Sequence, residues 1–125
     1  SSLLQVEAEL QEIVQLVGSD ALPIDQQLTL EVARMIREFF LQQNGFHEVD
    51  AYSGLEQQYK MAKAVLTFQD SAKKALASGG QLEDIVNVPA RTNLMRDRFE
   101  AGYLDRVDGL VDEMNKEIAA AAEDN

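Results

Sequence analysis

Apolar residues recur at intervals of three and four along much of the chain, and this spacing predicts amphipathic helices. The first predicted helix ends at Gly18, and the second begins within residues 25–28. The apolar positions of the first are Leu3, Val6, Leu10, Ile13, Val14 and Val17. Those of the second are Leu28, Val32, Met35, Ile36 and Phe39. Because Pro23 lacks an amide hydrogen and disfavours helix at Leu22, we expect a tight corner between two antiparallel helices.

The second half of the chain predicts further helices after an irregular stretch over residues 42–54. The first of them covers about residues 55–78 and ends at Gly79 and Gly80. Its expected inward-facing residues are Tyr59, Ala62, Val65, Leu66, Ala72 and Leu76. A short helix over residues 81–88 and another over residues 90–99 follow, with Pro89 between them. The last helix has a heptad-like stripe formed by Leu104, Val107, Val111, Met114 and Ile118.

No segment alternates apolar and polar residues as a strand does, so the sequence predicts an all-α fold. We expect a compact helical bundle of about five to six helices arranged as antiparallel hairpins. The length fits a single helical domain over residues 1–125, and the early start of the helical pattern suggests that this domain belongs to a longer protein. The stripe on the last helix has two interpretations, packing within the bundle or docking on a neighbouring protein of a complex.

The formal net charge of −11 argues against nucleic acid as a partner, because phosphate binding needs clustered lysine and arginine. It argues equally against docking on an anionic membrane, and no apolar run has the length of a membrane span. A basic protein partner, or an acidic surface without one, remains compatible with this charge. The chain has no cysteine, which excludes disulfides and thiolate metal sites.

Few residue patterns suggest chemistry. His47 with Glu48 and Asp50 is a weak metal candidate, because it is the only histidine and the spacing fits no helical ligand pair. We therefore expect no metal site and no catalytic residue, since the sequence also lacks a nucleophile motif and a phosphate-binding loop. A group of arginines beside acidic residues is expected to form surface ion pairs. This group consists of Arg91, Arg96 and Arg98, with Asp97 and Glu100.

Phe40 and Phe46 flank the polar segment over residues 42–45, at the end of the second predicted helix. For either ring alone, packing in the core is the favoured interpretation. Together they could form a flat apolar slot for a planar ring, because aromatic faces stack on aromatic rings.

The whole chain resembles the C-terminal helical domain of the catalytic A subunit of archaeal-type and vacuolar-type rotary ATPases. The resemblance rests on ELQEIVQLVGSDALP, QLTLEVARMIREFFLQQNGFHEVD and QYKMAKAVLTF. It implies that an upstream domain, absent from this chain, carries the phosphate-binding loop, the catalytic glutamate and the magnesium site. The helical domain would then move with the nucleotide state and push on the central rotor stalk. The parent subunit would use Mg-ATP, whereas this fragment would hold no cofactor.

The same resemblance implies site residues. The corner would contact the rotor stalk through Asp20, Ala21, Leu22, Pro23, Ile24 and Asp25. The related F-type beta subunit has an acidic element here, of which only the two aspartates remain, so a contact based on shape is expected. Phe46 would contact the adenine of ATP or ADP, and so would Phe40, which falls on a second aromatic near the same pocket.

The resemblance further implies partners and a location. The partners would be the catalytic and non-catalytic ring neighbours and the central stalk, in a cytoplasmic complex peripheral to the membrane. We expect the fragment alone neither to hydrolyse ATP nor to bind it tightly, because it supplies no charge stabilisation at the γ-phosphate. The alternative function is a stand-alone α-helical interaction module, in which the corner only links helices.

Overall fold

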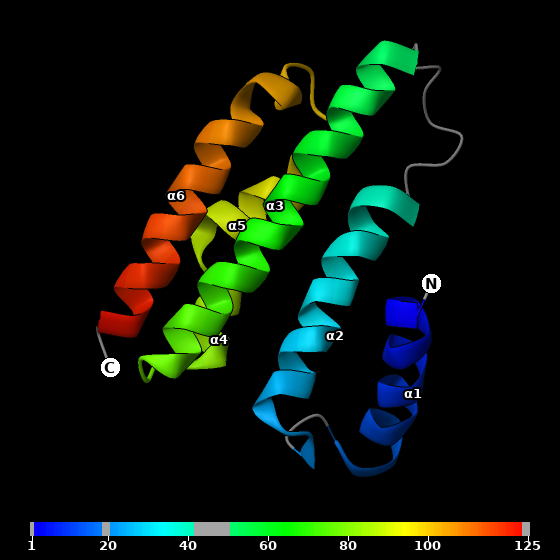
Figure 1. Cartoon of the computed structure of the whole chain (residues 1–125), viewed down its shortest axis with the longest axis vertical. Helices are drawn as coiled ribbons and strands as arrows, with labels where there is room; N and C mark the ends of the chain where they lie inside the picture. Colours follow the sequence, from blue (N-terminus) through cyan, green and yellow to red (C-terminus); the bar gives the residue numbers. More distant parts are fainter. Residues whose placement is uncertain (1, 19–20, 42–50, 124–125) are drawn as a thin grey trace.

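The computed structural model describes residues 2–18, 21–41 and 51–123, which form α-helices and one π-helical turn (Figure 1). They are α1 (Ser2–Val17), α2 (Ile24–Ile36), the π-helical turn η2 (Arg37–Leu41), α3 (Ala51–Ala77), α4 (Leu82–Val86), α5 (Pro89–Arg96) and α6 (Tyr103–Glu123). No strand occurs in these ranges, and the predicted all-α bundle is confirmed.

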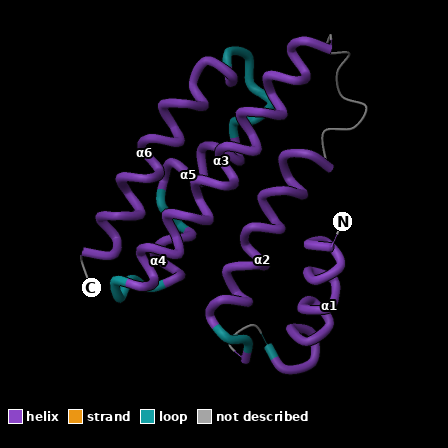
Figure 2. Tube along the Cα trace, in the orientation of Figure 1, coloured by secondary structure: helices purple, strands orange, loops and turns teal. Residues whose placement is uncertain are grey.

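The first three long helices, α1, α2 and α3, run antiparallel to one another in turn, whereas α3 and α6 run parallel. α1 and α2 form an antiparallel pair, and α3 runs antiparallel to α2 (Figures 1 and 2). α4 and α5 lead from the end of α3 back to the start of α6, so α3 and α6 run side by side in the same direction. Lys60 of α3 donates to the carbonyl of Leu104 over 2.8 Å, and Ser71 donates to Asn115, at the same sequence separation of 44. This constant separation is the signature of a parallel pair.

The predicted apolar stripes of α2 and α6 form much of the core. From α2 and η2 the buried residues include Leu28, Val32, Met35 and Phe39. From α6 they are Tyr103, Val107, Val111, Met114 and Ile118. The stripe on α6 therefore packs within the bundle, which decides between its two interpretations. Burial of such side chains contributes roughly 1.5–3 kcal/mol each.

The predicted inward face of α3 is partly wrong. Tyr59 and Leu66 are 70% and 64% exposed, and Ala62 is exposed as well. The face that packs on α2 and α6 consists of Met61, Ala64, Val65, Phe68, Ala72 and Ala75. Both sets of residues follow spacings of three and four, so α3 has two apolar stripes. Periodicity within one helix does not show which stripe its neighbours cover.

A similar rotation occurs in α1. Val6 and Ile13, predicted on the apolar stripe, are 41% and 42% exposed, whereas Glu7 is buried beside Leu10. Arg37 of η2 donates to the carboxylate of Glu7, so the face of α1 that carries Glu7 and Leu10 lies against α2 and η2. A buried carboxylate is tolerated because the charge is paired.

Glycine ends α3 as predicted, through a Schellman motif. The amide of Gly80 donates to the carbonyl of Ala75 over 2.8 Å, and the amide of Gly79 donates to the carbonyl of Leu76 over 3.1 Å. Gly79 has a φ of +97°, a backbone angle that residues with a side chain rarely adopt. A Cβ on Gly80 would lie only 3.3 Å from the Cα of Ala122, so the absence of a side chain lets α3 end against α6.

The start of α3 and the end of α5 differ from the predictions by several residues. α3 begins at Ala51, whereas the irregular stretch was expected to reach residue 54. α5 ends at Arg96 rather than at residue 99, and the backbone turns there to bring Tyr103 into the core. The Tyr103 hydroxyl donates to the carbonyl of Leu94, which ties the start of α6 to α5.

Candidate functional site

The corner that joins α1 to α2 is held by hydrogen bonds. Gln27 donates its side-chain amide to the carbonyl of Leu22 over 2.8 Å, and the amide of Ala21 donates to the carbonyl of Gly18 over 3.2 Å. Pro23 precedes the first turn of α2, and its carbonyl accepts from the amide of Gln27 over 3.0 Å. These hydrogen bonds hold the described residues of the corner, 18 and 21–27, in place.

The corner residues predicted to contact a rotor differ in exposure. Leu22 is buried, and the exposed residues are Ala21, Pro23, Ile24 and Asp25. Ile24 is the largest of them, with 49% of its surface exposed. Asp20, which was predicted with them, lies outside the described residues. A surface cavity of about 510 Å³ opens beside Ile24, between α2 and α3. The corner thus presents an apolar side chain anchored by a buried neighbour.

The predicted aromatic site lies at the opposite end of α2, where the helix continues into η2. π-Helical turns are rare and occur frequently at functional sites. Phe39 is fully buried, whereas Phe40 is partly exposed and packs against the edge of the core. Phe46 lies outside the described residues, so Phe40 is the one member of the predicted pair that the structure places.

The prediction of surface ion pairs in the arginine group is wrong for Arg91, whose side chain is 3% exposed. Its guanidinium donates to the carboxylate of Glu31 over 3.1 Å and to the carbonyl of Val86 over 3.2 Å. Its Cζ also lies 4.3 Å from the ring centroid of Phe68. Burial lowers the pKa of Arg91, and the charge and hydrogen bond of Glu31 oppose this effect. Arg91 is therefore a core residue that joins α5 to α2 and α3.

The other two arginines of the group lie nearer the surface. Arg98, with a side chain 15% exposed, donates to the carboxylate of Glu38 over 2.9 Å. Arg96 is exposed and donates to the carboxylate of Asp97 over 2.9 Å. For Arg96 the predicted surface ion pair is confirmed.

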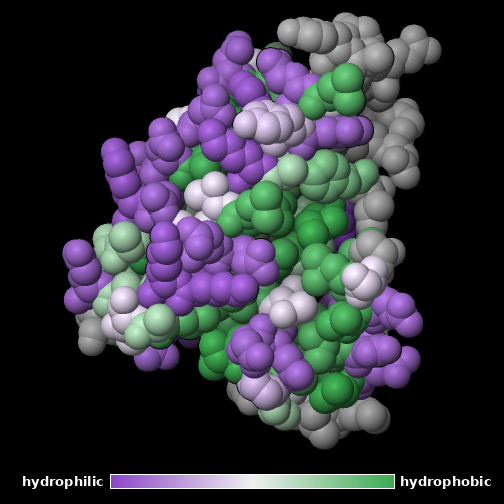
Figure 3. Space-filling model, in the orientation of Figure 1, coloured by the Kyte–Doolittle hydropathy of each residue, from purple (hydrophilic) through white to green (hydrophobic). Residues whose placement is uncertain are grey.

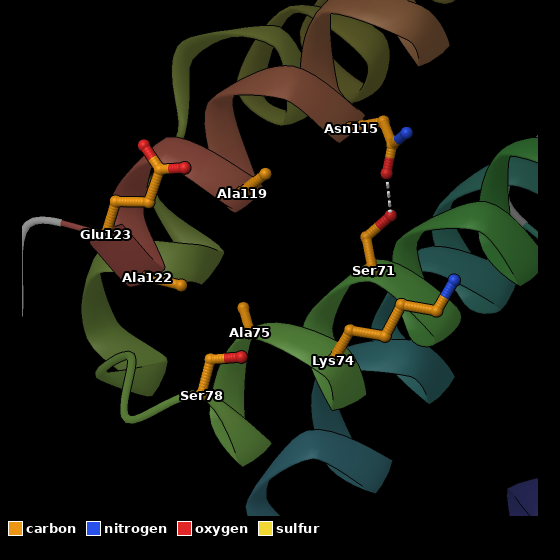
Figure 4. Close-up of a pocket in the computed structure, with 8 residues that line it drawn as sticks. All are labelled: Ser71, Lys74, Ala75, Ser78, Asn115, Ala119, Ala122 and Glu123. Carbon is orange, nitrogen blue, oxygen red and sulfur yellow. Dashed lines mark hydrogen bonds between the residues drawn. The ribbon is translucent and has the colours of Figure 1, made fainter.

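A groove lies between the ends of α3 and α6 (Figure 4). It has a volume of about 410 Å³, and the Ser71 hydroxyl donates to Asn115 at one end of it. Its lining residues are Ser71, Lys74, Ala75, Ser78, Asn115, Ala119, Ala122 and Glu123. The small side chains explain the hollow, and they bring no cluster of chemically active groups together.

The uncovered stripe of α3 gives the surface an apolar line formed by Leu55, Tyr59 and Leu66. On the face shown in Figure 3, hydrophilic residues cover α6, and hydrophobic residues gather over α2 and the adjoining part of α3. An exposed apolar line of this kind is typical of a surface that contacts another protein.

The metal candidate formed by His47, Glu48 and Asp50 lies outside the described residues. Within the described ranges, no group of three or more metal-binding side chains comes together. None of the helices in these ranges is long and apolar enough to cross a membrane.

Residues 1–86 match the family described as the C-terminal domain of V and A type ATP synthase. The chain belongs to this family. It is 50% identical over 118 residues to the A subunit of the A-type ATP synthase of Methanosarcina barkeri, which covers 94% of the chain and 20% of that relative. It is 52% identical over 124 residues to the V-type ATP synthase alpha chain 1 of Clostridium tetani, and this match covers 98% of the chain and 20% of that relative. The chain thus spans about a fifth of the length of these relatives.

The family match covers both predicted sites, since the corner and η2 lie within residues 1–86. α5 and α6 follow the matched region, yet the similarity to the Methanosarcina barkeri protein continues over most of the chain. These two relatives therefore match the chain on both sides of Val86.

Sequence reasoning missed the assembly around Arg91. Glu31 and Arg91 are 60 residues apart, and Phe68 lies on a third helix, so no local spacing links them. The sequence did offer one signal, the apolar pair Ala90 and Leu94 at helical spacing around Arg91. Both of these residues are buried in the structure, on the helix face that turns inward.

Proposed function

We propose that the chain is the C-terminal domain of the A subunit of a rotary ion-translocating ATP synthase or ATPase. In that role it couples the nucleotide state of its parent protein to the central rotor stalk. The family membership and the names of the relatives support this proposal. The observation that carries it is the corner, where exposed Ile24 stands on a backbone anchored by buried Leu22.

The corner suits a contact that transmits force through shape. Its backbone is fixed by the bond from Gln27, and Pro23 restricts the chain further because its φ is locked. Asp25 is the one carboxylate among the described corner residues, so charge has a small part in the contact. A stiff apolar projection moves with the bundle when the bundle rotates as a rigid body.

Phe40, together with Phe46, is proposed to form the adenine-side edge of a nucleotide pocket completed by the rest of the parent protein. Phe40 supports this because part of its ring remains exposed in η2. α2 contains 13 residues and η2 contains 5. At a helical rise of about 1.5 Å per residue, they span roughly 27 Å from the corner to the region of this ring. One continuous helical segment would therefore connect the rotor contact with the nucleotide contact.

The remaining functions would belong to the complete complex. The parent protein would hold Mg-ATP and perform hydrolysis or synthesis, and this domain would stand against the ring neighbours and the stalk. The complex would lie on the cytoplasmic side, peripheral to the membrane. The purified chain alone should show no ATPase activity, because among the described residues no cluster of three or more metal-binding side chains comes together to hold the magnesium used in phosphoryl transfer.

The decisive experiment replaces Ile24 with aspartate in the complete enzyme and compares ATP hydrolysis with rotation. The proposal predicts altered coupling with an unchanged helical signal, because Ile24 is exposed. Val6→Asp is the matched control, since it also adds a charge at an exposed apolar position but lies near the start of α1, away from the corner. Leu22 is unsuitable for this purpose, because a charge at a buried position would disrupt the corner itself.

The second candidate, a stand-alone interaction module, is favoured by the exposed apolar line on α3. It predicts that Ile24→Asp leaves coupling unchanged, whereas a change at Tyr59 or Leu66 weakens binding to a partner protein. Equal coupling in the Ile24→Asp and wild-type enzymes would therefore favour this module over the rotary role.

A further inference from the structure

A second concave region lies between α2, η2 and α5, on residues to which the proposed function assigns no role. It is a surface cavity of about 280 Å³. Its lining residues are Arg34, Glu38, Val86, Asn87, Arg91, Thr92, Met95, Arg96 and Arg98. Four of the eleven basic residues of this acidic chain therefore meet at one cavity.

The carboxylates around the cavity do not balance its arginines. Glu31, Glu38 and Asp97 pair with Arg91, Arg98 and Arg96 respectively. Arg34 reaches only Glu31, at 3.9 Å, and Glu31 already accepts from Arg91. Four guanidinium groups against three carboxylates leave one excess positive charge, and Arg34 is 53% exposed at the cavity mouth. This surplus of one guanidinium contrasts with the net charge of −11 of the whole chain.

Two of these arginines also have unused donors. The Nε atoms of Arg91 and Arg98 are buried and have no hydrogen-bond partner among the described residues. The Arg91 side chain is 3% exposed, so this N–H has little access to bulk water. A buried charged donor without a partner is unfavourable by roughly 1–3 kcal/mol or more, and only an acceptor that reaches the Nε atom itself would remove that penalty.

We propose that this cavity binds a phosphate-type oxyanion, either free phosphate or the phosphate group of a small organic ester. A guanidinium group can bind two oxygens of a phosphate at once through paired N–H donors, and Thr92, which also lines the cavity, carries a hydroxyl donor. An anion at the mouth of the cavity would compensate the excess charge of Arg34, and an anion drawn further in would accept hydrogen bonds from the buried Nε donors. Water would satisfy the donors but would leave the charge in place.

The test follows the Nε–Hε signals of the six arginines by nuclear magnetic resonance in the 125-residue chain. Sodium phosphate and glycerol phosphate are titrated separately against sodium chloride at constant ionic strength. The proposal predicts saturable shifts of the Arg91 and Arg98 signals, with Arg37, which pairs with Glu7 away from the cavity lining, as the internal reference. Saturation by phosphate identifies the free ion as sufficient, and saturation by glycerol phosphate alone identifies the ester as the ligand.

A matched pair of variants makes the test independent of folding defects. Arg34→Gln removes the exposed guanidinium at the mouth and should weaken apparent affinity about tenfold, the effect of losing one charged hydrogen bond. Lys116→Gln, at an exposed position of α6, removes the same charge and should leave affinity unchanged. Equal weakening in both variants, or no saturable shift with either phosphate, would overturn the proposal and indicate a hydrated cavity.

Discussion

Arg91 places its guanidinium 4.3 Å from the ring centroid of Phe68, at the point where α2, α3 and α5 meet. The same guanidinium donates to Glu31 and to the end of α4 at Val86. One buried cation therefore connects four helices. Cation–π contacts of desolvated groups contribute about 2 kcal/mol, and the paired carboxylate adds to this.

Arg91→Ala should reduce the free energy of unfolding by about 3 kcal/mol, because it breaks a buried ion pair and opens space above Phe68. Urea denaturation followed by circular dichroism measures this change. Arg34→Ala is the control, since its exposed side chain forms only a long contact with Glu31, and it should change stability by less than about 0.5 kcal/mol. Equal effects of the two substitutions would show that Arg91 has no special role in the core.

Truncation of Phe39 and truncation of Phe46 should change the free energy of unfolding by different amounts. Phe39→Ala removes a fully buried ring and should cost about 3–5 kcal/mol in the isolated chain. Phe46→Ala should cost little, if Phe46 serves the proposed nucleotide pocket of the complete parent protein. Chemical denaturation of both variants compares them directly. A loss at Phe46 as large as the loss at Phe39 would assign Phe46 to the core and remove the adenine contact.

Glycines at two positions should give effects of opposite sign. Gly109→Ala, in the middle of α6 with nothing within 4 Å of the added Cβ, should stabilise the chain by about 0.5–1 kcal/mol. Gly80→Ala should destabilise it, because the Cβ would lie 3.0 Å from the carbonyl oxygen of Ala75 and close to Ala122. Thermal unfolding of both variants measures the two signs. A gain in stability at Gly80 would mean that α3 and α6 separate there without cost.

Stability should fall at alkaline pH because of Tyr103. Burial raises the pKa of its hydroxyl above the unfolded value of about 10, so the unfolded chain releases this proton first. The contribution is fully present below pH 10 and is lost as the pH rises toward the folded pKa. Denaturation midpoints measured across this range should fall less steeply for Tyr103→Phe than for the wild type. Tyr59→Phe, which removes an exposed hydroxyl, should retain the wild-type slope.

The corner could be predicted in part from the sequence, whereas the arginine cavity could not. The corner followed from Gly18 and Pro23, whose backbone chemistry is local, but the burial of Leu22 beside exposed Ile24 depends on packing against the bundle. The arginine cavity was out of reach, because Arg34 and Arg91 come from segments far apart in the chain. The sequence showed the arginines as a surface group, whereas the fold turns Arg91 inward.

The sequence by itself determined that the chain is helical, where α3 stops, and which faces of α2 and α6 are buried. These properties depend on local periodicity and on the backbone preferences of glycine and proline, so they can be deduced from neighbouring residues. Only the tertiary structure decided which apolar stripe of α3 is covered, how α1 is rotated around the Glu7 ion pair, and where Arg91 lies. Each of these choices is made by contacts with distant segments, such as the parallel register that joins Lys60 to Leu104 across 44 residues.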